Sequence, residues 1–90
     1  MPMRQNPNYL LRTVAGSLVL VPVGEATKDF PGMITMNPTG AYLWEQLAKP
    51  CTEEELVAAL LDRYDVTADQ ARADTAAFLE PLKVIGAVVE

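Results

Sequence analysis

The chain has 90 residues, half of them hydrophobic, and a formal net charge of −5. This length and apolar content predict one folded domain over residues 1–90 and argue against a disordered chain, and no apolar run approaches the roughly 20 residues that a membrane-spanning helix needs. Residues 49–90 carry nine acidic and four basic side chains and hold the whole net charge, which argues against a nucleic-acid partner because phosphate binding needs clustered Lys and Arg.

The first eight residues, MPMRQNPN, show neither strand nor helix periodicity. Residues 1–8 are therefore predicted to form a flexible N-terminus. The segment also lacks the basic-then-apolar order of a secretory signal peptide, so we expect a cytoplasmic location and no attachment to a membrane.

Three strands are predicted in the first half of the chain. Residues 9–14 and 17–23 are rich in aliphatic and β-branched side chains and are separated by an Ala-Gly pair, so they are expected to form a hairpin. Residues 24–32 end in Pro-Gly and are predicted to form a connecting turn. The short apolar run from Met33 to Met36 is a third strand, which lies at the edge of the sheet if the strands form an antiparallel meander.

The first predicted helix begins where this third strand ends. Asn37 is a favourable N-cap, and Pro38 suits the first helical position because its missing N–H would have no partner there. The helix should end before Lys49-Pro50, since a residue that precedes proline avoids the helical conformation. Gly40 weakens a helical first turn, so either this turn packs closely on a neighbour or a partner's backbone passes beside it.

Two further helices are predicted from capping boxes. Thr52-x-x-Glu55 begins the second helix and Thr67-x-x-Gln70 begins the third. Apolar spacing of three and four predicts the buried faces, which are Leu56, Val57, Leu60, Leu61 and Tyr64 in the second helix and Ala71, Thr75, Phe78, Leu79, Leu82 and Ile85 in the third. Pro81 removes one backbone hydrogen bond, so it should kink or split the third helix.

The order of strands first and helices afterwards predicts an α+β fold. We expect a three-stranded antiparallel sheet followed by three helices, which is also the layout of a winged helix-turn-helix domain. The tail over residues 87–89 is either a last short strand or packed coil.

The sequence offers little for catalysis. It contains no His, so it lacks the commonest general base and metal ligand. Ser17 lies in a predicted strand, Cys51 stands alone, and no Gly-rich phosphate-binding loop is present. We therefore expect a protein that is not an enzyme and that needs neither a metal nor a cofactor.

The predicted edge strand is the strongest candidate for a binding surface. Proteins usually protect an exposed strand edge with Lys or Pro, but Met33 to Met36 contain no charge and no proline. Such an edge can pair with an extended peptide, whose affinity comes from backbone hydrogen bonds and whose selectivity comes from side-chain pockets.

Three motifs also occur in a specific order and spacing: Asn37-x-Thr39-Gly40-x-x-x-Trp44, then Thr52-x-x-Glu55-Leu56, then Tyr64-Asp65-Val66. Together they resemble the PqqD family, and the resemblance extends over about residues 9–90. The resemblance implies a winged-helix-like fold and a domain with no catalytic activity of its own.

The resemblance also implies a function in the recognition of ribosomally made peptides. The leader segment of a precursor peptide would add as a strand beside the third strand, in a groove against the third helix. The domain would then present the peptide to a modifying enzyme, often a radical S-adenosylmethionine protein, as in pyrroloquinoline quinone-type biosynthesis. On this chain the implied peptide site comprises Met33, Ile34, Thr35 and Met36 of the strand and Asp69, Arg72, Ala73, Ala76 and Leu79 of the helix.

Two other functions fit the predicted layout. A winged helix can bind DNA, although the third helix offers only Arg72 and Lys83 against Asp69, Asp74 and Glu80. Alternatively the chain is a structural subunit whose edge strand pairs with that of a second copy, which makes the oligomeric state either a monomer or an edge-strand dimer.

Overall fold

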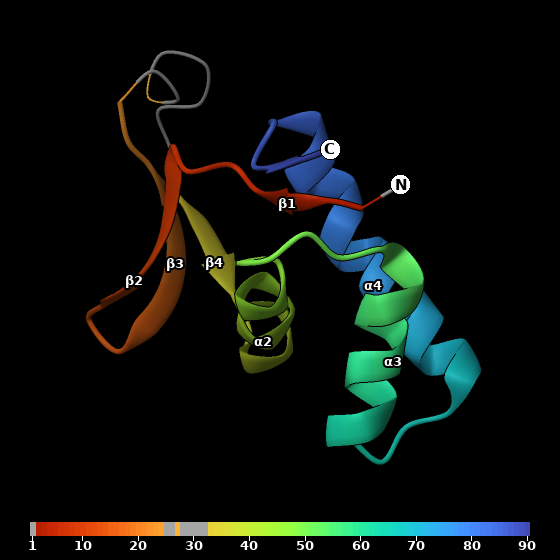
Figure 1. Cartoon of the computed structure of the whole chain (residues 1–90). Coiled ribbons are helices and arrows are strands. Elements are labelled where there is room, and N and C mark those ends of the chain that lie inside the picture. The colour runs from red at the N-terminus through yellow and green to blue at the C-terminus, as the bar shows by residue number, and fades with distance from the viewer. Residues whose placement is uncertain (1, 25–26, 28–32) are drawn as a thin grey trace.

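The computed structural model describes residues 2–24, 27 and 33–90. Figure 1 shows the strands β2, β3 and β4 on one side of the molecule and the helices beside them. In chain order the elements are β1 (Arg4–Gln5), β2 (Tyr9–Val14), β3 (Ser17–Pro22), β4 (Ile34–Met36), α2 (Pro38–Gln46), α3 (Glu53–Arg63), α4 (Ala68–Val84) and β5 (Val88–Val89). The predicted α+β class, with a three-stranded antiparallel sheet followed by three helices, is confirmed.

The predicted hairpin is formed by β2 and β3. The two strands pair from Val14↔Ser17 to Tyr9↔Pro22, so only Ala15 and Gly16 make the turn. Both turn residues have positive φ, 51° and 82°, as a type I′ turn requires, and this turn matches the right-handed twist of the paired strands.

β4 completes the sheet in the order β2-β3-β4 and lies at its edge, as predicted. It pairs with β3 through Leu18↔Met36, Val19↔Thr35 and Leu20↔Ile34, and it is one residue shorter than the predicted strand because Met33 is outside it. Of the predicted turn over residues 24–32, all but two residues lie outside the described part of the chain.

The three helices begin where the sequence predicted. The Asn37 side chain accepts a hydrogen bond from the Gly40 N–H (2.7 Å), and Pro38 opens α2. Thr52 and Glu55 form the complete capping box of α3. At α4 the Thr67 hydroxyl accepts from the Gln70 N–H (3.1 Å), but the Gln70 side chain turns forward along the helix, so only half of that capping box is formed.

Two details of the predicted helices are wrong. Leu61 is 41% exposed, because the buried stripe of α3 runs through Leu56, Val57 and Leu60 and leaves Leu61 beside it. Of the two outcomes predicted for Pro81, a kink or a split, the split does not occur, since α4 continues without interruption to Val84. Pro81 lies in the last turns, where the helix loses one donor and is still closed by the Ile85 N–H to Pro81 C=O bond (3.3 Å).

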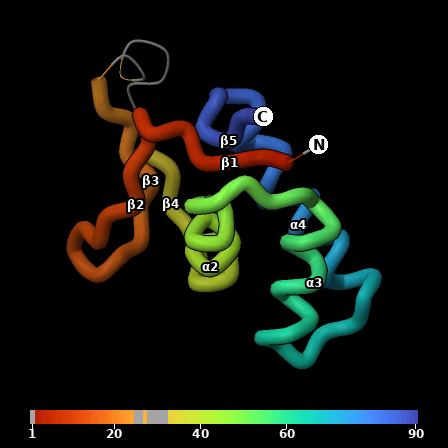
Figure 2. The backbone as a smooth tube through the Cα atoms, in the orientation of Figure 1, coloured from red at the N-terminus to blue at the C-terminus, as the bar shows by residue number. Residues whose placement is uncertain are grey.

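The N-terminal segment differs from the flexible arm that the sequence suggested. β1 pairs antiparallel with β5, with Arg4 opposite Val89, and Figure 2 shows these two ends of the chain side by side. On its other side the Gln5 N–H donates to the Leu47 C=O (3.0 Å), and Met3 is buried. These partners are more than 40 residues away along the chain, so local sequence patterns do not reveal them.

One hydrophobic core joins the sheet and the helices. It includes Leu20 from β3, Met36 from β4 and, from the helices, Leu43, Trp44, Leu56, Leu60, Leu79 and Leu82. Thr75 is buried among them, and its hydroxyl donates to the Ala71 C=O (2.8 Å), so its polar atom has a partner. Within the described residues, no helix is long and apolar enough to cross a membrane.

Candidate functional site

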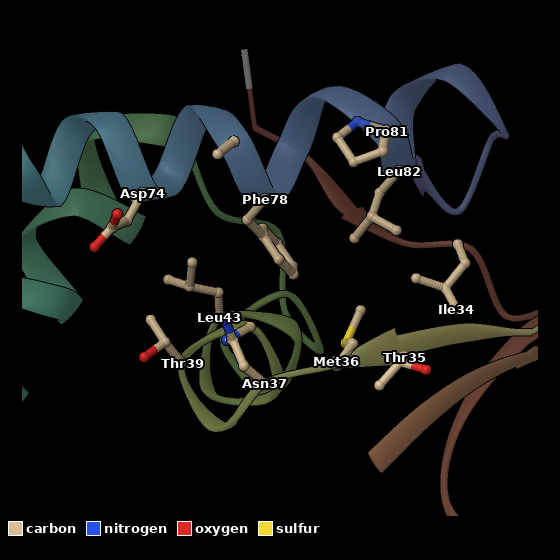
Figure 3. Close-up of a pocket in the computed structure, with 12 residues that line it drawn as sticks. Ile34, Thr35, Met36, Asn37, Thr39, Leu43, Asp74, Phe78, Pro81 and Leu82 are labelled. Carbon is tan, nitrogen blue, oxygen red and sulfur yellow. The ribbon is translucent and has the colours of Figure 1, made fainter. Parts of the chain in front are cut away.

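A groove of about 330 Å³ lies between the edge strand β4 and helix α4. Figure 3 shows the two walls facing each other. One wall is Ile34, Thr35 and Met36 of β4 with Asn37, Thr39, Gly40 and Leu43 of the α2 start, and the other is Asp74, Ala77, Phe78, Pro81 and Leu82 of α4.

The hairpin geometry determines which backbone groups of β4 face the open edge. In a two-residue hairpin the residues that flank the turn form a hydrogen-bonded pair. From there, hydrogen-bonded and non-hydrogen-bonded pairs alternate along the two strands. The backbone groups of the odd-numbered residues of β3 therefore bond to β2. The Val23 N–H, which donates to the Asn8 C=O (2.7 Å), continues this pattern. Leu18 and Leu20 therefore bond to β4, and their partners on β4 are Met36 and Ile34.

Thr35 consequently directs its N–H and C=O away from β3, toward the open edge. Asn37 is also extended, with φ −80° and ψ 168°, so its N–H faces the same way. The edge ends there, because the Asn37 C=O already accepts from the Ala41 N–H (3.0 Å) and Pro38 has no N–H. β4 thus offers a short row of backbone donors and acceptors beside the groove.

The opposite edge of the sheet, formed by β2, is protected. The Tyr9 N–H donates to the Asn6 C=O (3.0 Å) within the chain's own N-terminal turn. The Arg12 guanidinium donates to the Leu11 C=O (3.2 Å), which the alternation directs outward. A charged side chain and a local turn are typical protections of a strand edge, and β4 carries neither. The two edges of this sheet are therefore not equivalent.

The groove has an apolar end and a polar end. β4 and α4 run in opposite directions along it, so Ile34 lies toward Pro81 and Leu82, Met36 and the polar Asn37 lie below Phe78, and the polar Thr39 lies below Asp74 (Figure 3). Gly40 forms part of the floor at the polar end, and a Cβ there would come within 3.6 Å of Phe78 Cδ1 and 3.2 Å of Asn37 Oδ1. The glycine therefore allows close packing of the first turn of α2 against α4.

Asp74 is the one charged residue among the described residues that line the groove. One of its carboxylate oxygens, Oδ1, accepts a hydrogen bond from Gln70 Nε2 (2.7 Å), one helical turn earlier. No Lys or Arg of the described residues forms an ion pair with it, since Arg72 turns the other way to Glu54 (3.9 Å).

The structure brings only part of the predicted peptide site to this groove. Ile34, Thr35 and Met36 line it, whereas Met33 is 59% exposed and lies outside it. On α4 the lining face is a neighbour of the predicted one: Asp69, Arg72, Ala73 and Ala76 are exposed outside the lining, and Leu79 is buried. Ala73 lies one turn before Ala77, so a longer peptide would pass it.

Sequence reasoning missed Asp74, Ala77, Phe78 and Pro81 as groove residues. Their helical face is adjacent to the buried stripe of Ala71, Thr75 and Leu79, and which side of that stripe meets the sheet is decided by packing. The available signal in the sequence was a large aromatic residue, Phe78, followed three residues later by Pro81, which cannot donate a backbone hydrogen bond.

The described residues contain no group of His, Cys, Asp or Glu that could hold a metal ion. Burial and the nearby Glu55 carboxylate raise the pKa of the Cys51 thiol, which disfavours the thiolate that a reactive cysteine needs. The groove is suited to binding an extended segment.

Comparison with known proteins identifies the family. Two solved structures have the same fold: "Lasso peptide synthetase B1 complexed with the leader peptide", with a TM-score of 0.73 and 22% identity over 98% of each chain, and "TbiB1 in Complex with the TbiA(beta) Leader Peptide", with a TM-score of 0.71 and 18% identity over 94% of this chain and 93% of that chain. The search of curated proteins gives no significant match. The family model described as coenzyme PQQ synthesis protein D (PqqD) matches residues 17–88. Because that match spans most of the sequence, including β3, β4, the three helices and the groove between β4 and α4, the chain belongs to the PqqD family.

Proposed function

We propose that this protein binds the leader segment of a ribosomally made precursor peptide as an added strand on β4. The observation that carries the proposal is the combination of an unprotected strand edge with an adjoining groove, which are the two requirements of peptide binding by strand addition. Both similar structures are complexes with leader peptides, which supports the same class of ligand here.

The bound peptide would use the backbone of Thr35 and Asn37 for its hydrogen bonds. The peptide residue opposite Thr35 would exchange two hydrogen bonds with it if the added strand is antiparallel, as the rest of the sheet is. Alternate peptide side chains would then enter the groove, beside Ile34 and Met36 and under Phe78.

The domain would act as an adaptor without catalytic activity. The groove contains no nucleophile next to a base and, among the described residues, no metal-binding cluster. We propose that it presents its peptide to a separate modifying enzyme in the cytoplasm, where precursor peptides are made. A radical S-adenosylmethionine protein is the first candidate for that enzyme, given the chain's membership of a family described by coenzyme PQQ synthesis.

The charge of α4 does not favour the DNA-binding alternative. Its Arg72 lies 3.9 Å from Glu54, and its other basic residue, Lys83, shares the helix with three acids, Asp69, Asp74 and Glu80. A dimer in which two β4 edges pair would compete with peptide binding for the same backbone groups. Light scattering over a range of concentrations distinguishes such a dimer from a monomeric adaptor.

An NMR titration tests the proposed function. The 15N-labelled protein is titrated with leader peptides of candidate precursors encoded next to its gene, and amide shifts are mapped. We expect the largest shifts at residues 34–40 and 74–82. Shifts confined to β2, or a complete absence of binding by every encoded leader, would count against strand addition on β4.

A further inference from the structure

We infer that Asp74 selects leader peptides that carry a Lys or Arg at the polar end of the groove. This inference rests on the proposed function, because it concerns which peptides the same groove prefers. It follows from three features of the site: the position of the carboxylate, the spacing of the turns of α4, and the direction of an added strand.

The Asp74 carboxylate is available to a ligand. The side chain is partly buried at the groove wall, and in Figure 3 it points from α4 toward the side where Thr39 lies. Gln70 binds Oδ1 and thereby fixes the orientation of the carboxylate, while Oδ2 has no partner among the described residues. A cationic side chain placed here gains a charge-assisted hydrogen bond in a site that is partly shielded from water.

The rest of the groove wall on α4 is apolar and repeats once per helical turn. Asp74, Phe78 and Pro81 lie on successive turns, separated by four and then three residues, which advance about 6 Å and about 4.5 Å along the helix. Two residues of an extended strand advance about 6.7 Å. Two strand residues therefore match the step from Asp74 to Phe78 closely, and the next alternate side chain of the peptide falls at or just past Pro81.

The direction of the added strand orders these preferences. An antiparallel strand beside β4 runs from the Asp74 end of the groove to the Pro81 end, because β4 itself runs from Ile34 toward Asn37. Read from its N-terminal end, the preferred peptide segment then has a basic residue at its first position and apolar residues at its third and fifth positions, with any residue between them. The first apolar side chain meets Phe78 and Met36, and the second meets Pro81 and Ile34.

A display selection tests this order without knowledge of the natural leader. A library of random dodecapeptides is selected against the intact protein, against Asp74→Asn and Asp74→Lys, and against Asp62→Asn as a control for the same charge change on α3. We expect the natural chain and Asp62→Asn to enrich the basic residue ahead of two alternate apolar residues. Asp74→Asn should keep the apolar alternation and lose the basic preference, and Asp74→Lys should favour an acidic residue at that position.

The enriched peptide then gives a quantitative measure. Replacing its basic residue by Gln should weaken binding to the natural protein about five-fold, as for a well-oriented, partly exposed ion pair, and should leave binding to Asp74→Asn unchanged. The five-fold difference should shrink at high salt, because partly exposed charge pairs are screened.

The outcomes separate the inference from the proposed function. If the natural protein and Asp74→Asn enrich the same peptides, the role of Asp74 is refuted while strand addition stands. A parallel selection against Thr35→Pro, which removes the N–H that faces the open edge, tests the function itself. If Thr35→Pro enriches the same peptides as the natural protein, the proposed function is refuted and this inference with it. The same holds if the natural protein enriches no common peptide pattern.

Discussion

Val19 and Thr35 lie opposite each other in a pair that exchanges no backbone hydrogen bonds, so the N–H and C=O of Thr35 face the open edge of the sheet. The neighbouring residues of β4, Ile34 and Met36, bond to β3 instead. Two adjacent residues of the same strand therefore have different tasks: Ile34 holds β4 in the sheet, and Thr35 presents the edge that we propose binds the peptide.

Proline substitutions separate these two tasks. Thr35→Pro should leave a folded domain, because proline is tolerated on the outward side of an edge strand, and should lower peptide affinity at least ten-fold through loss of a ladder donor. Ile34→Pro removes a bond within the sheet and should lower the free energy of unfolding by about 1–3 kcal/mol. Circular dichroism and fluorescence polarisation measure the two effects. Equal affinity of Thr35→Pro and the natural protein would contradict the assignment of the outward N–H.

Gly40 lines the groove at its polar end. Gly40→Leu should place a side chain against Phe78 and Asn37 Oδ1 and occupy space that we propose receives the peptide. We expect a loss of peptide binding together with a loss of stability, because a Cβ at this buried position already comes within 3.2 Å of the Asn37 Oδ1 that caps α2. Fluorescence polarisation and chemical denaturation of the same sample compare the two. Undiminished peptide binding by a folded Gly40→Leu variant would show that the peptide avoids this end.

The Tyr9 hydroxyl joins the first strand of the sheet to the end of α4 by donating to the Ile85 C=O (2.9 Å). Tyr9 is buried, so Tyr9→Phe should leave that carbonyl without this donor and lower the free energy of unfolding by about 1 kcal/mol. Urea denaturation measures this change. Because Tyr9 does not line the groove, peptide affinity of the folded variant should be unaltered, and a change in affinity would argue against a purely structural role.

Cys51 should react slowly with alkylating reagents. Burial and the Glu55 carboxylate raise its thiol pKa, so at pH 8 less thiolate is present than in a free cysteine. We expect iodoacetamide to label the folded protein more slowly than the urea-unfolded protein at the same pH, and Glu55→Gln to increase the rate. A folded rate equal to the unfolded rate would contradict the raised pKa.

The sequence predicts the elements of this fold well because their signals are local. Asn37-Pro38 and the Thr52 capping box lie within one turn of the helices that they begin, and the Ala-Gly pair lies within the hairpin that it closes. In contrast, β1 was missed because its partners Leu47 and Val89 are far away along the chain.

The sequence predicted the strand that lines the candidate site, but the face of α4 that it predicted lies beside the face that lines the groove. An uncharged edge strand is visible in the residues themselves, so β4 could be named from the sequence. The face of α4 that meets it could not, because Arg72 and Phe78 lie on different sides of the same buried stripe and only the packing of α4 against α3 and the sheet decides which one faces β4.

The pairing of β1 with β5 places Arg4 beside Val89, so the polypeptide enters and leaves this fold at nearly the same point. A unit with adjacent ends can be spliced into a surface loop of another protein without stretching either chain, and its own ends can be joined and reopened elsewhere. The same architecture is therefore suited both to a free-standing subunit and to a module inserted into a larger chain.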